Sequence, residues 1–161
     1  GELAAVRERH GPELLLGAGT LRSVDDVEAA IGAGADCLVS PHFEPELCLA
    51  MIGSGRLALP GVLTPSEVAA ALAAGAEAVK LFPSSLGGIA YMRALWGPFP
   101  GLRMVPTGGI GSHSAAEWLA AGAAAVAAGT ELPAGCDRGR ALGPADRGRR
   151  ALPRGARRGR R

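Results

Sequence analysis

Short apolar runs alternate with longer mixed stretches through the first 133 residues of the chain. Each apolar run ends in Gly, Pro, Ser or Thr, and the stretch that follows it closes on Ala-Gly or Ser-Gly. A short apolar run between turn residues is typical of a buried strand. The pattern predicts strands at residues 14–17, 37–40, 56–59, 76–82, 103–106 and 124–128, with helices of about ten to twelve residues between them.

The predicted helices carry recognisable start and stop residues. Ser23 can cap a helix with an acidic first turn, and Thr64, followed by Pro65 and Glu67, is close to a capping box. A glycine follows each helix, where a left-handed residue commonly ends it. The starts and stops pair in chain order as Ser23 with Gly34, Thr64 with Gly75, and Ser112 or Ser114 with Gly122.

Six strands that alternate with helices predict a parallel α/β fold. A strand spacing of about 20–25 residues fits a (β/α)8 barrel, in which the catalytic residues lie at the carboxyl ends of the strands. We therefore expect a TIM-barrel-type fold, with about six of its eight β/α units present in this sequence.

Composition narrows the class of protein further. A chain of 161 residues can form one sizeable domain, and its core must be aliphatic because only 4% of the residues are aromatic. The apolar runs are too short to span a membrane, and the first ten residues are typical of an amphipathic helix rather than a signal peptide. Cys37, Cys48 and Cys136 have neither disulfide-frame nor metal-ligand spacing, which favours free thiols, a cytoplasmic location and no metal or other cofactor.

The net charge of +2 combines two different populations. Residues 1–133 hold seven basic and thirteen acidic side chains, whereas residues 134–161 hold ten arginines and two aspartates. We predict a folded domain over 1–133 and a disordered Arg/Gly-rich tail over 134–161, because the tail is too polar to order itself. A phosphate-contacting nucleic-acid arm and a plain extension are alternatives for the tail. A frame-shifted read-through of GC-rich DNA is slightly favoured, because the sequence changes character abruptly after Pro133.

Lys80 is the only lysine in the chain, and it lies within the apolar run predicted as the strand 76–82. A buried ammonium is costly, and burial lowers the pKa of lysine readily, which frees an amine that can attack a carbonyl. Arginine cannot form a Schiff base, which explains why lysine is retained here. Chance survival in an arginine-rich coding sequence is the alternative.

Alternate side chains of a strand share one face. Lys80 and Phe82 should therefore point into the mouth of the barrel, while Val79 and Leu81 face the helices. Glu77, an odd number of positions from Lys80, should face away from it.

The ends of the other predicted strands support a site for a carbonyl compound and a phosphate. A glycine-rich turn between a strand and a helix can present backbone N–H groups to an anion, and barrels often bind phosphate after their last two strands. The segments concerned are Gly-Ala-Gly-Thr at 17–20, Ser-Pro-His at 40–42, Pro-Thr-Gly-Gly-Ile at 106–110 and Gly-Thr at 129–130. A plain turn is the more common meaning of each one alone, but their ordered recurrence around Lys80 is far more specific.

These motifs resemble those of the class I KDPG/KHG aldolase family, in order and in spacing. The resemblance covers about residues 1–133 and includes Val-Ser-Pro at 39–41, Leu-Pro-Gly-Val at 59–62, Val-Lys-Leu-Phe-Pro at 79–83, Gly-Pro-Phe at 97–99 and Ala-Gly-Thr at 128–130. It implies a lyase that cleaves 2-dehydro-3-deoxy-6-phosphogluconate, or its 6-phosphogalactonate epimer, to pyruvate and glyceraldehyde 3-phosphate. Residues 83–85 are similar to the galactonate branch, and Ser-Pro-His and Gly-Pro-Phe to the gluconate branch.

The resemblance also implies roles for individual residues. Lys80 would form the Schiff base and Thr20 would contact the pyruvate carboxylate. Pro41 and Phe82 would line the pocket. The remaining residues would hold the substrate hydroxyl and phosphate: Thr107, Gly108, Gly109, Gly129 and Thr130. No metal or cofactor is implied, the partners would be the phosphorylated sugar acid and pyruvate, and a homotrimer would be the assembly.

The sequence also departs from the family pattern. The resemblance places the first two strands and the first helix of an eight-stranded barrel before residue 1, so we expect an N-terminally truncated fragment or a degenerate copy. The family's proton-shuttle glutamate and carboxylate-binding arginine then have no counterpart, and Glu131 and His42 are candidates to replace the glutamate. Two alternatives to an active aldolase follow. One is a remnant that binds a phosphorylated acid with little or no cleavage, and the other is a different phosphate-binding barrel such as a sugar-phosphate epimerase.

Overall fold

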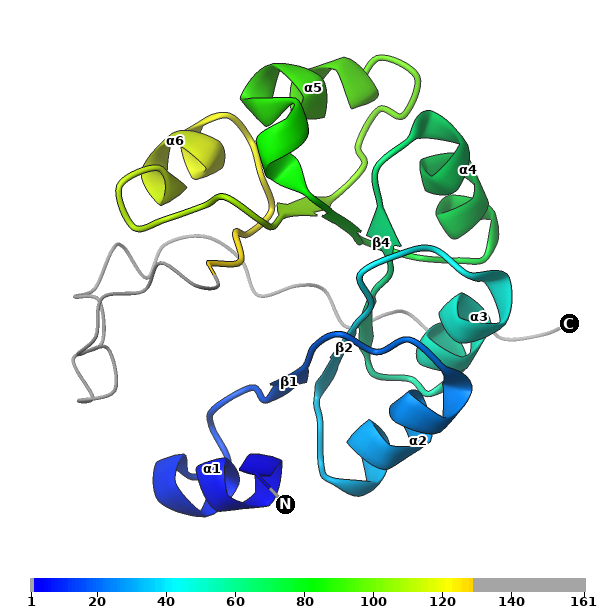
Figure 1. Ribbon diagram of the computed structural model, residues 1–161, viewed down its shortest axis with the longest axis vertical. Coiled ribbons are helices and arrows are strands. Elements are labelled where there is room, and N and C mark those ends of the chain that lie inside the picture. The colour runs from blue at the N-terminus through cyan, green and yellow to red at the C-terminus, as the bar shows by residue number, and fades with distance from the viewer. Residues whose placement is uncertain (1, 129–161) are drawn as a thin grey trace, which may run out of the picture.

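Parallel strands alternate with helices in the computed structural model, which describes residues 2–128 (Figure 1). The predictions made for Gly129, Thr130, Glu131, Cys136 and the tail 134–161 lie outside the described residues. The helices are α1 (Glu2–His10), α2 (Val24–Gly32), α3 (Pro45–Gly53), α4 (Pro65–Ala73), the 3-10 helix η1 (Ser84–Leu86), α5 (Gly88–Leu95) and α6 (Ala115–Ala120). The strands are β1 (Gly17–Ala18), β2 (Cys37–Val39), β3 (Leu57–Leu59), β4 (Gly61–Val62), β5 (Val79–Leu81) and β6 (Met104–Pro106).

The strands form two three-stranded sheets, with the orders β1-β2-β3 and β4-β5-β6. All strand pairs are parallel, so the carboxyl ends of the strands lie at one common edge. Pro60 joins the two sheets, because it lies between β3 and β4 and its carbonyl accepts a 2.9 Å hydrogen bond from the N–H of Lys80. Helices α2 to α6 follow one another outside the strands (Figure 1), which confirms the predicted parallel α/β architecture.

The caps predicted for two helices are present, whereas Ser114 precedes α6 without a side-chain cap hydrogen bond. The hydroxyl of Ser23 accepts a hydrogen bond from the N–H of Asp26, and Thr64 and Glu67 form a complete capping box at the start of α4. The glycines Gly34 and Gly75 have positive φ angles of 86° and 97°, which a side chain would disfavour. These local interactions fix where the helices begin and end, and therefore where the following strands can begin.

The first strand begins later than predicted, at Gly17 rather than at residue 14. Leu14 is 41% exposed, and its carbonyl accepts a hydrogen bond from the side chain of Arg7. The N–H of Leu16 donates to the carboxylate of Asp36 at 2.9 Å. Side chains therefore occupy backbone groups that a neighbouring strand would otherwise bind, and the prediction of a strand over 14–17 was wrong at its start.

Two of the predicted strands, 76–82 and 124–128, are shorter in the structure than in the sequence pattern. The run 76–82 contributes only β5. In the run 124–128 a single parallel bridge joins Ala127 to Thr107, and the Ala127 N–H donates to the Pro106 carbonyl at 3.0 Å. This segment still lies beside β6 and continues the strand order.

The core divides into two clusters that correspond to the two sheets. Helices α2 and α3 pack on β2 around Leu38, Leu47 and Met51, which are at most 1% exposed. Val79 and Leu81 of β5 belong to the second cluster, which also contains Val62, Val68, Met92, Met104 and Trp118. Within residues 2–128 the helices are all too short or too polar to cross a bilayer.

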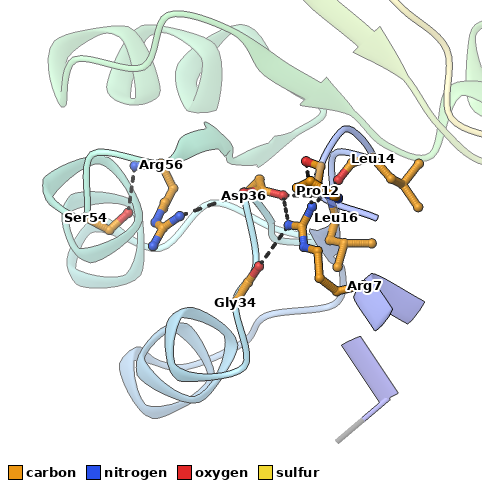
Figure 2. Close-up of polar contacts among 8 residues, drawn as sticks. All are labelled: Arg7, Pro12, Leu14, Leu16, Gly34, Asp36, Ser54 and Arg56. Carbon is orange, nitrogen blue, oxygen red and sulfur yellow. Dashed lines mark hydrogen bonds and ion pairs between the residues drawn. The ribbon is translucent and has the colours of Figure 1, made fainter. Parts of the chain in front are cut away.

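An ionic cluster fastens the amino-terminal edge of the first sheet (Figure 2). Asp36, which precedes β2, forms an ion pair with Arg7 of α1, and Arg56 lies 3.9 Å from its other carboxylate oxygen. The Arg7 guanidinium also donates to the carbonyls of Pro12 and Leu14. One aspartate thus ties α1 and the loop after it to β1, β2 and the start of β3.

Replacing Arg7 with alanine should lower the thermal unfolding temperature by several degrees, because α1 loses its main polar link to the sheet. Arg9→Ala is the matched control, since Arg9 lies on the same helix, is exposed and makes no hydrogen bond or ion pair within the described residues. Equal unfolding temperatures for the two variants would show that the cluster does not stabilise the fold.

The contribution of this cluster should depend on pH. The hydrogen bond from the Leu16 N–H, followed by that from Arg7, lowers the pKa of Asp36 from its ordinary value of 3.8. A carboxyl with a lowered folded pKa stabilises the protein above its unfolded pKa, and loses this effect as the pH falls through the folded value. Unfolding measured from neutral to acidic pH should therefore show wild type and Arg7→Ala converging in acid. A constant difference would contradict the assignment to Asp36.

Candidate active site

Lys80 occupies the middle of β5 and is 8% exposed. Its neighbours Val79 and Leu81 belong to the core that the helices cover, at 0% and 1% exposure. Alternate side chains of a strand lie on opposite faces, so the Lys80 side chain lies on the face opposite Val79 and Leu81, where it contacts Phe82. Glu77 is exposed and precedes the strand, and it does not contact Lys80 by any described hydrogen bond or ion pair.

The amine of Lys80 lies beside the aromatic ring of Phe82. Among the described residues, no hydrogen bond or ion pair involves its Nζ, which lies 4.5 Å from the centroid of the Phe82 ring. Burial lowers the pKa of Lys80 from its ordinary value of 10.5, because the charged form loses hydration. A neutral amine is thus more accessible at moderate pH than on an exposed lysine, which suits nucleophilic attack on a carbonyl.

Phe82 connects Lys80 with the glycine-rich turn after β6. A Cβ atom at Gly108 would lie only 3.1 Å from Cε2 of the Phe82 ring, so the ring packs against the backbone of this glycine. Gly108 has a φ of 89° and Gly109 a φ of 75°. The structure therefore brings Lys80, Phe82 and Gly108 together. The positive φ favours glycine at this contact, and a Cβ atom there would have to push the ring away by a few tenths of an ångström.

A buried serine fastens this turn to β5. The hydroxyl of Ser84 donates to the carbonyl of Leu81 at 2.8 Å and accepts from the N–H of Thr107 at 2.8 Å. The Ser84 N–H donates in turn to the Thr107 carbonyl at 2.8 Å. Thr107 is thus fixed at the end of β6, next to the strand that carries Lys80.

A second buried serine, Ser40, follows β2 and fastens its loop to β4, the strand that pairs with β5. The hydroxyl of Ser40, 1% exposed, donates to the carbonyl of His42 and accepts from the N–H of Gly61 at 3.0 Å. A Cβ atom at Gly61 would lie 2.4 Å from the carbonyl carbon of Pro41. Since Gly61 is the register partner of Lys80, its missing side chain lets the Pro41 segment approach the strand next to the amine.

Thr20 follows β1 at the same edge of the sheets, with an unusual backbone. Its φ is 61°, the left-handed region, where a β-branched residue is a genuine outlier. It is exposed, and no described interaction joins it to Lys80. Backbone strain of this kind persists only where the surroundings enforce it, and it is concentrated at functional sites.

Other candidate groups show no described contact with Lys80 or are outside the described residues. Cys37 and Cys48 are free thiols, and burial, followed by nearby Asp36 and Glu44 respectively, raises the pKa of each, which makes them poor nucleophiles. His42 is exposed. The region 2–128 contains no group of three or more His, Cys, Asp or Glu side chains placed to hold a metal ion. Gly129, Thr130 and Glu131 are outside the described residues.

Sequence reasoning missed Gly61 and Ser84 as parts of the site, and it included Ser40 only within the segment Ser-Pro-His, without a role of its own. Ser40 and Gly61 stand in the motifs Val-Ser-Pro and Leu-Pro-Gly-Val, which carried the family resemblance without an assigned role. A small polar residue directly after an apolar strand was the available signal. A serine there can return its hydroxyl to the backbone, but its second partner belongs to another strand and is visible only in the fold.

The comparisons with known proteins agree on one family. The family model for KDPG and KHG aldolase matches residues 2–137. The 2-dehydro-3-deoxy-phosphogluconate aldolase of Treponema pallidum is 41% identical over 73% of this chain and 56% of its own length. The 2-dehydro-3-deoxy-6-phosphogalactonate aldolase of Escherichia coli is 34% identical over 81% of this chain and 64% of its own length.

A solved structure shows the same backbone arrangement. The KDPG aldolase of Legionella pneumophila, with pyruvate captured as a covalent carbinolamine intermediate, superimposes with a TM-score of 0.72 at 34% identity, over 77% of this chain and 61% of that one. The chain thus spans between half and two thirds of the length of these relatives.

Replacing Ser40 with alanine should reduce the free energy of unfolding by about 1–3 kcal/mol, because the buried N–H of Gly61 loses its acceptor. Chemical denaturation measures this change. Ser66→Ala is the control, since Ser66 is exposed on α4 and its hydroxyl makes no described hydrogen bond; we expect its effect to lie within about 0.5 kcal/mol. Similar losses in both variants would mean that Ser40 does not fasten the loop.

Replacing Thr20 with glycine should leave stability unchanged or raise it by up to about 2 kcal/mol. Removing the backbone strain of a threonine in the left-handed region stabilises the fold by about 1–3 kcal/mol. The greater flexibility of glycine in the unfolded chain offsets about 0.5–1 kcal/mol of that gain. Thr20→Ser, which keeps the hydroxyl and the strained backbone, should stay close to wild type in the same denaturation experiment. A clear loss of stability in Thr20→Gly would show that strain is not stored at this residue.

Proposed function

The chain belongs to the KDPG and KHG aldolase family, and we propose that it is a class I, Schiff-base aldolase acting on a phosphorylated 2-keto-3-deoxy sugar acid. The substrate would be 2-dehydro-3-deoxy-6-phosphogluconate or its 6-phosphogalactonate epimer, and the products pyruvate and glyceraldehyde 3-phosphate. The single observation that carries the proposal is the buried Lys80 in the middle of β5, whose amine has no ionic or hydrogen-bond partner within residues 2–128.

The proposed reaction begins when the neutral Nζ of Lys80 attacks the C2 ketone of the substrate. The resulting carbinolamine loses water and gives an iminium. The bond between C3 and C4 then breaks: its electron pair enters the iminium to form an enamine, the C4 hydroxyl gives up its proton, and the aldehyde leaves. Protonation of the enamine at C3 and hydrolysis by one water release pyruvate and restore the amine. A carbinolamine with pyruvate is the species captured in the Legionella pneumophila relative.

The other residues of the site would bind the substrate around that amine. We assign Thr20 to the pyruvate carboxylate, and Pro41 and Phe82 to the walls beside the reacting carbons. The positive φ angles at Gly108 and Gly109 and the fixed position of Thr107 suit a turn that offers N–H groups to the phosphate or a hydroxyl. Gly129 and Thr130 would complete that end of the site.

Proton transfer is the step of the reaction for which the described residues include the fewest candidate acids or bases. Within residues 2–128 no carboxylate forms a hydrogen bond or ion pair with Lys80, and the exposed His42 is a candidate in the loop whose backbone approaches Gly61. A positioned acid or base typically contributes about 10²–10⁴-fold to such a reaction. Imine formation by this chain is therefore expected to be more robust than complete turnover.

The proposal extends to the setting of the domain. The described β/α units would form part of an eight-unit barrel, with the domain ending near residue 133. A homotrimer in the cytoplasm is the arrangement that the family resemblance implies. Sedimentation of the purified chain tests the assembly directly.

Incubation with pyruvate and sodium borohydride should add one reduced pyruvate to the intact protein, because the hydride converts the imine into a stable secondary amine. Lys80→Arg is the matched variant, since it keeps the positive charge and the chain's α-amino group but removes the only lysine. We expect the adduct, read by intact mass, in wild type and not in the variant.

Two results would contradict the proposal. A folded wild type without an adduct would show that Lys80 does not form an imine, as a phosphate-binding remnant or an epimerase would behave. An adduct that persists in Lys80→Arg would place the reactive amine at the amino terminus.

A further inference from the structure

The ring of Phe82 contacts two parts of the site that have different tasks. Its centroid lies 4.5 Å from Nζ of Lys80, the distance of a cation–π contact. Its Cε2 and Cδ2 atoms would lie 3.1 and 3.3 Å from a Cβ atom at Gly108. The ring is therefore packed against the turn at 107–109 and has a cation or an amine near it.

The ring is also the main described group able to stabilise a charge on Lys80. The strands packed against β5, namely β3, β4 and β6, carry no titratable side chain. In the adjoining segments, the hydroxyl of Tyr91 donates to the Leu63 carbonyl, and His42 and Glu77 are exposed. Burial lowers the pKa of Lys80, and no charged neighbour among residues 2–128 contributes to that shift.

We propose that Phe82 is a positioning residue for Lys80. Its ring packs against Gly108 and holds the Lys80 amine beside the ring face, so that a movement of the 107–109 turn moves the ring and changes its contact with the amine. The ring attracts the ammonium form, whereas burial favours the neutral amine. A displacement of the ring removes this attraction, so that the proton passes to water and the nitrogen lone pair becomes available. The catalytic meaning of this contact rests on the proposed function, but the contact itself does not.

The presence of a single lysine makes the proposal directly measurable. Protein labelled with ¹³C at lysine Cε gives one side-chain signal, whose chemical shift follows the protonation of Lys80 without any substrate. In Phe82→Leu the titration midpoint should move to lower pH, because the ring's attraction for the ammonium is lost while an apolar side chain remains. In Phe82→Tyr, which keeps the ring face, the midpoint should stay near that of wild type.

Three outcomes would overturn the proposal. An unchanged midpoint in folded Phe82→Leu would show that the ring does not act on the amine. A midpoint moved to higher pH would show that the ring acts only by excluding water. A shift of equal size in Phe82→Tyr would also contradict it, since a merely structural disturbance would then explain both variants.

The role of the turn is tested by a pair of glycine substitutions. Gly108→Ala places a methyl group against the Phe82 ring and should shift the Lys80 midpoint in the same direction as Phe82→Leu. Gly101→Ala is the matched control: Gly101 has a similar φ of 80°, but its Cβ position has no atom within 4 Å. Equal midpoints in these two variants would refute transmission through the ring, even if both lose backbone stability.

Failure of this inference and failure of the proposed function give different results. The titration requires no pyruvate, so it can succeed in a chain that forms no borohydride adduct. Conversely, an adduct in wild type together with an unchanged Lys80 titration midpoint in Phe82→Leu would support the aldolase proposal and refute the positioning role of Phe82. Where both hold, the initial rate of adduct formation at a pH where the amine is neutral should fall in Phe82→Leu by roughly tenfold to a hundredfold, the range expected for a misplaced reacting group.

Discussion

The burial of one primary amine sets the requirements that the rest of the site must meet. Lys80 is 8% exposed on a strand whose other face is sealed by helices, and it has no counter-ion among the described residues. Such an amine is tolerable because it can lose its proton, and that loss is also what makes it reactive. Stability and chemistry therefore depend on the same desolvation, and the strands beside β5 contribute apolar residues and Gly61 rather than charge.

The approach to that amine depends on backbone groups fixed at the carboxyl edge of the sheets. Ser40 and Ser84 each donate to a carbonyl of their own segment and accept an N–H from a neighbouring strand. The Ser40 hydroxyl is the acceptor for the Gly61 N–H, and an unpaired buried N–H would cost about 1–3 kcal/mol. The Thr107 N–H is shared between the Ser84 hydroxyl and the Leu81 carbonyl, at 2.8 and 2.9 Å. The two serines hold the Pro41 loop and the Thr107 turn on either side of Lys80.

The sequence pattern predicted much of this arrangement, and its failures have physical reasons. Periodicity and caps located the helices, and alternation along β5 placed Lys80 opposite Val79 and Leu81. The start of β1 was wrong because Arg7 and Asp36 occupy the backbone groups of Leu14 and Leu16, a contact between residues far apart in the chain. Gly61 was missed for the same kind of reason, since its need for a hydrogen side chain arises from the Pro41 backbone on another strand.

The two ends of β1 show how a strained residue is maintained. Before the strand, Asp36 binds the Leu16 N–H, and the Leu16 carbonyl accepts from the N–H groups of Asp36 and Cys37 at 2.7 and 3.1 Å. After it, the N–H of Leu21 donates to the Val39 carbonyl at 3.1 Å. Thr20 lies between these anchors and cannot relax without breaking one of them, so its φ of 61° is imposed by the frame rather than chosen by the residue. Threonine at this position is worse for folding than glycine would be, and its hydroxyl, exposed at the edge where Lys80 emerges, is the property that glycine lacks.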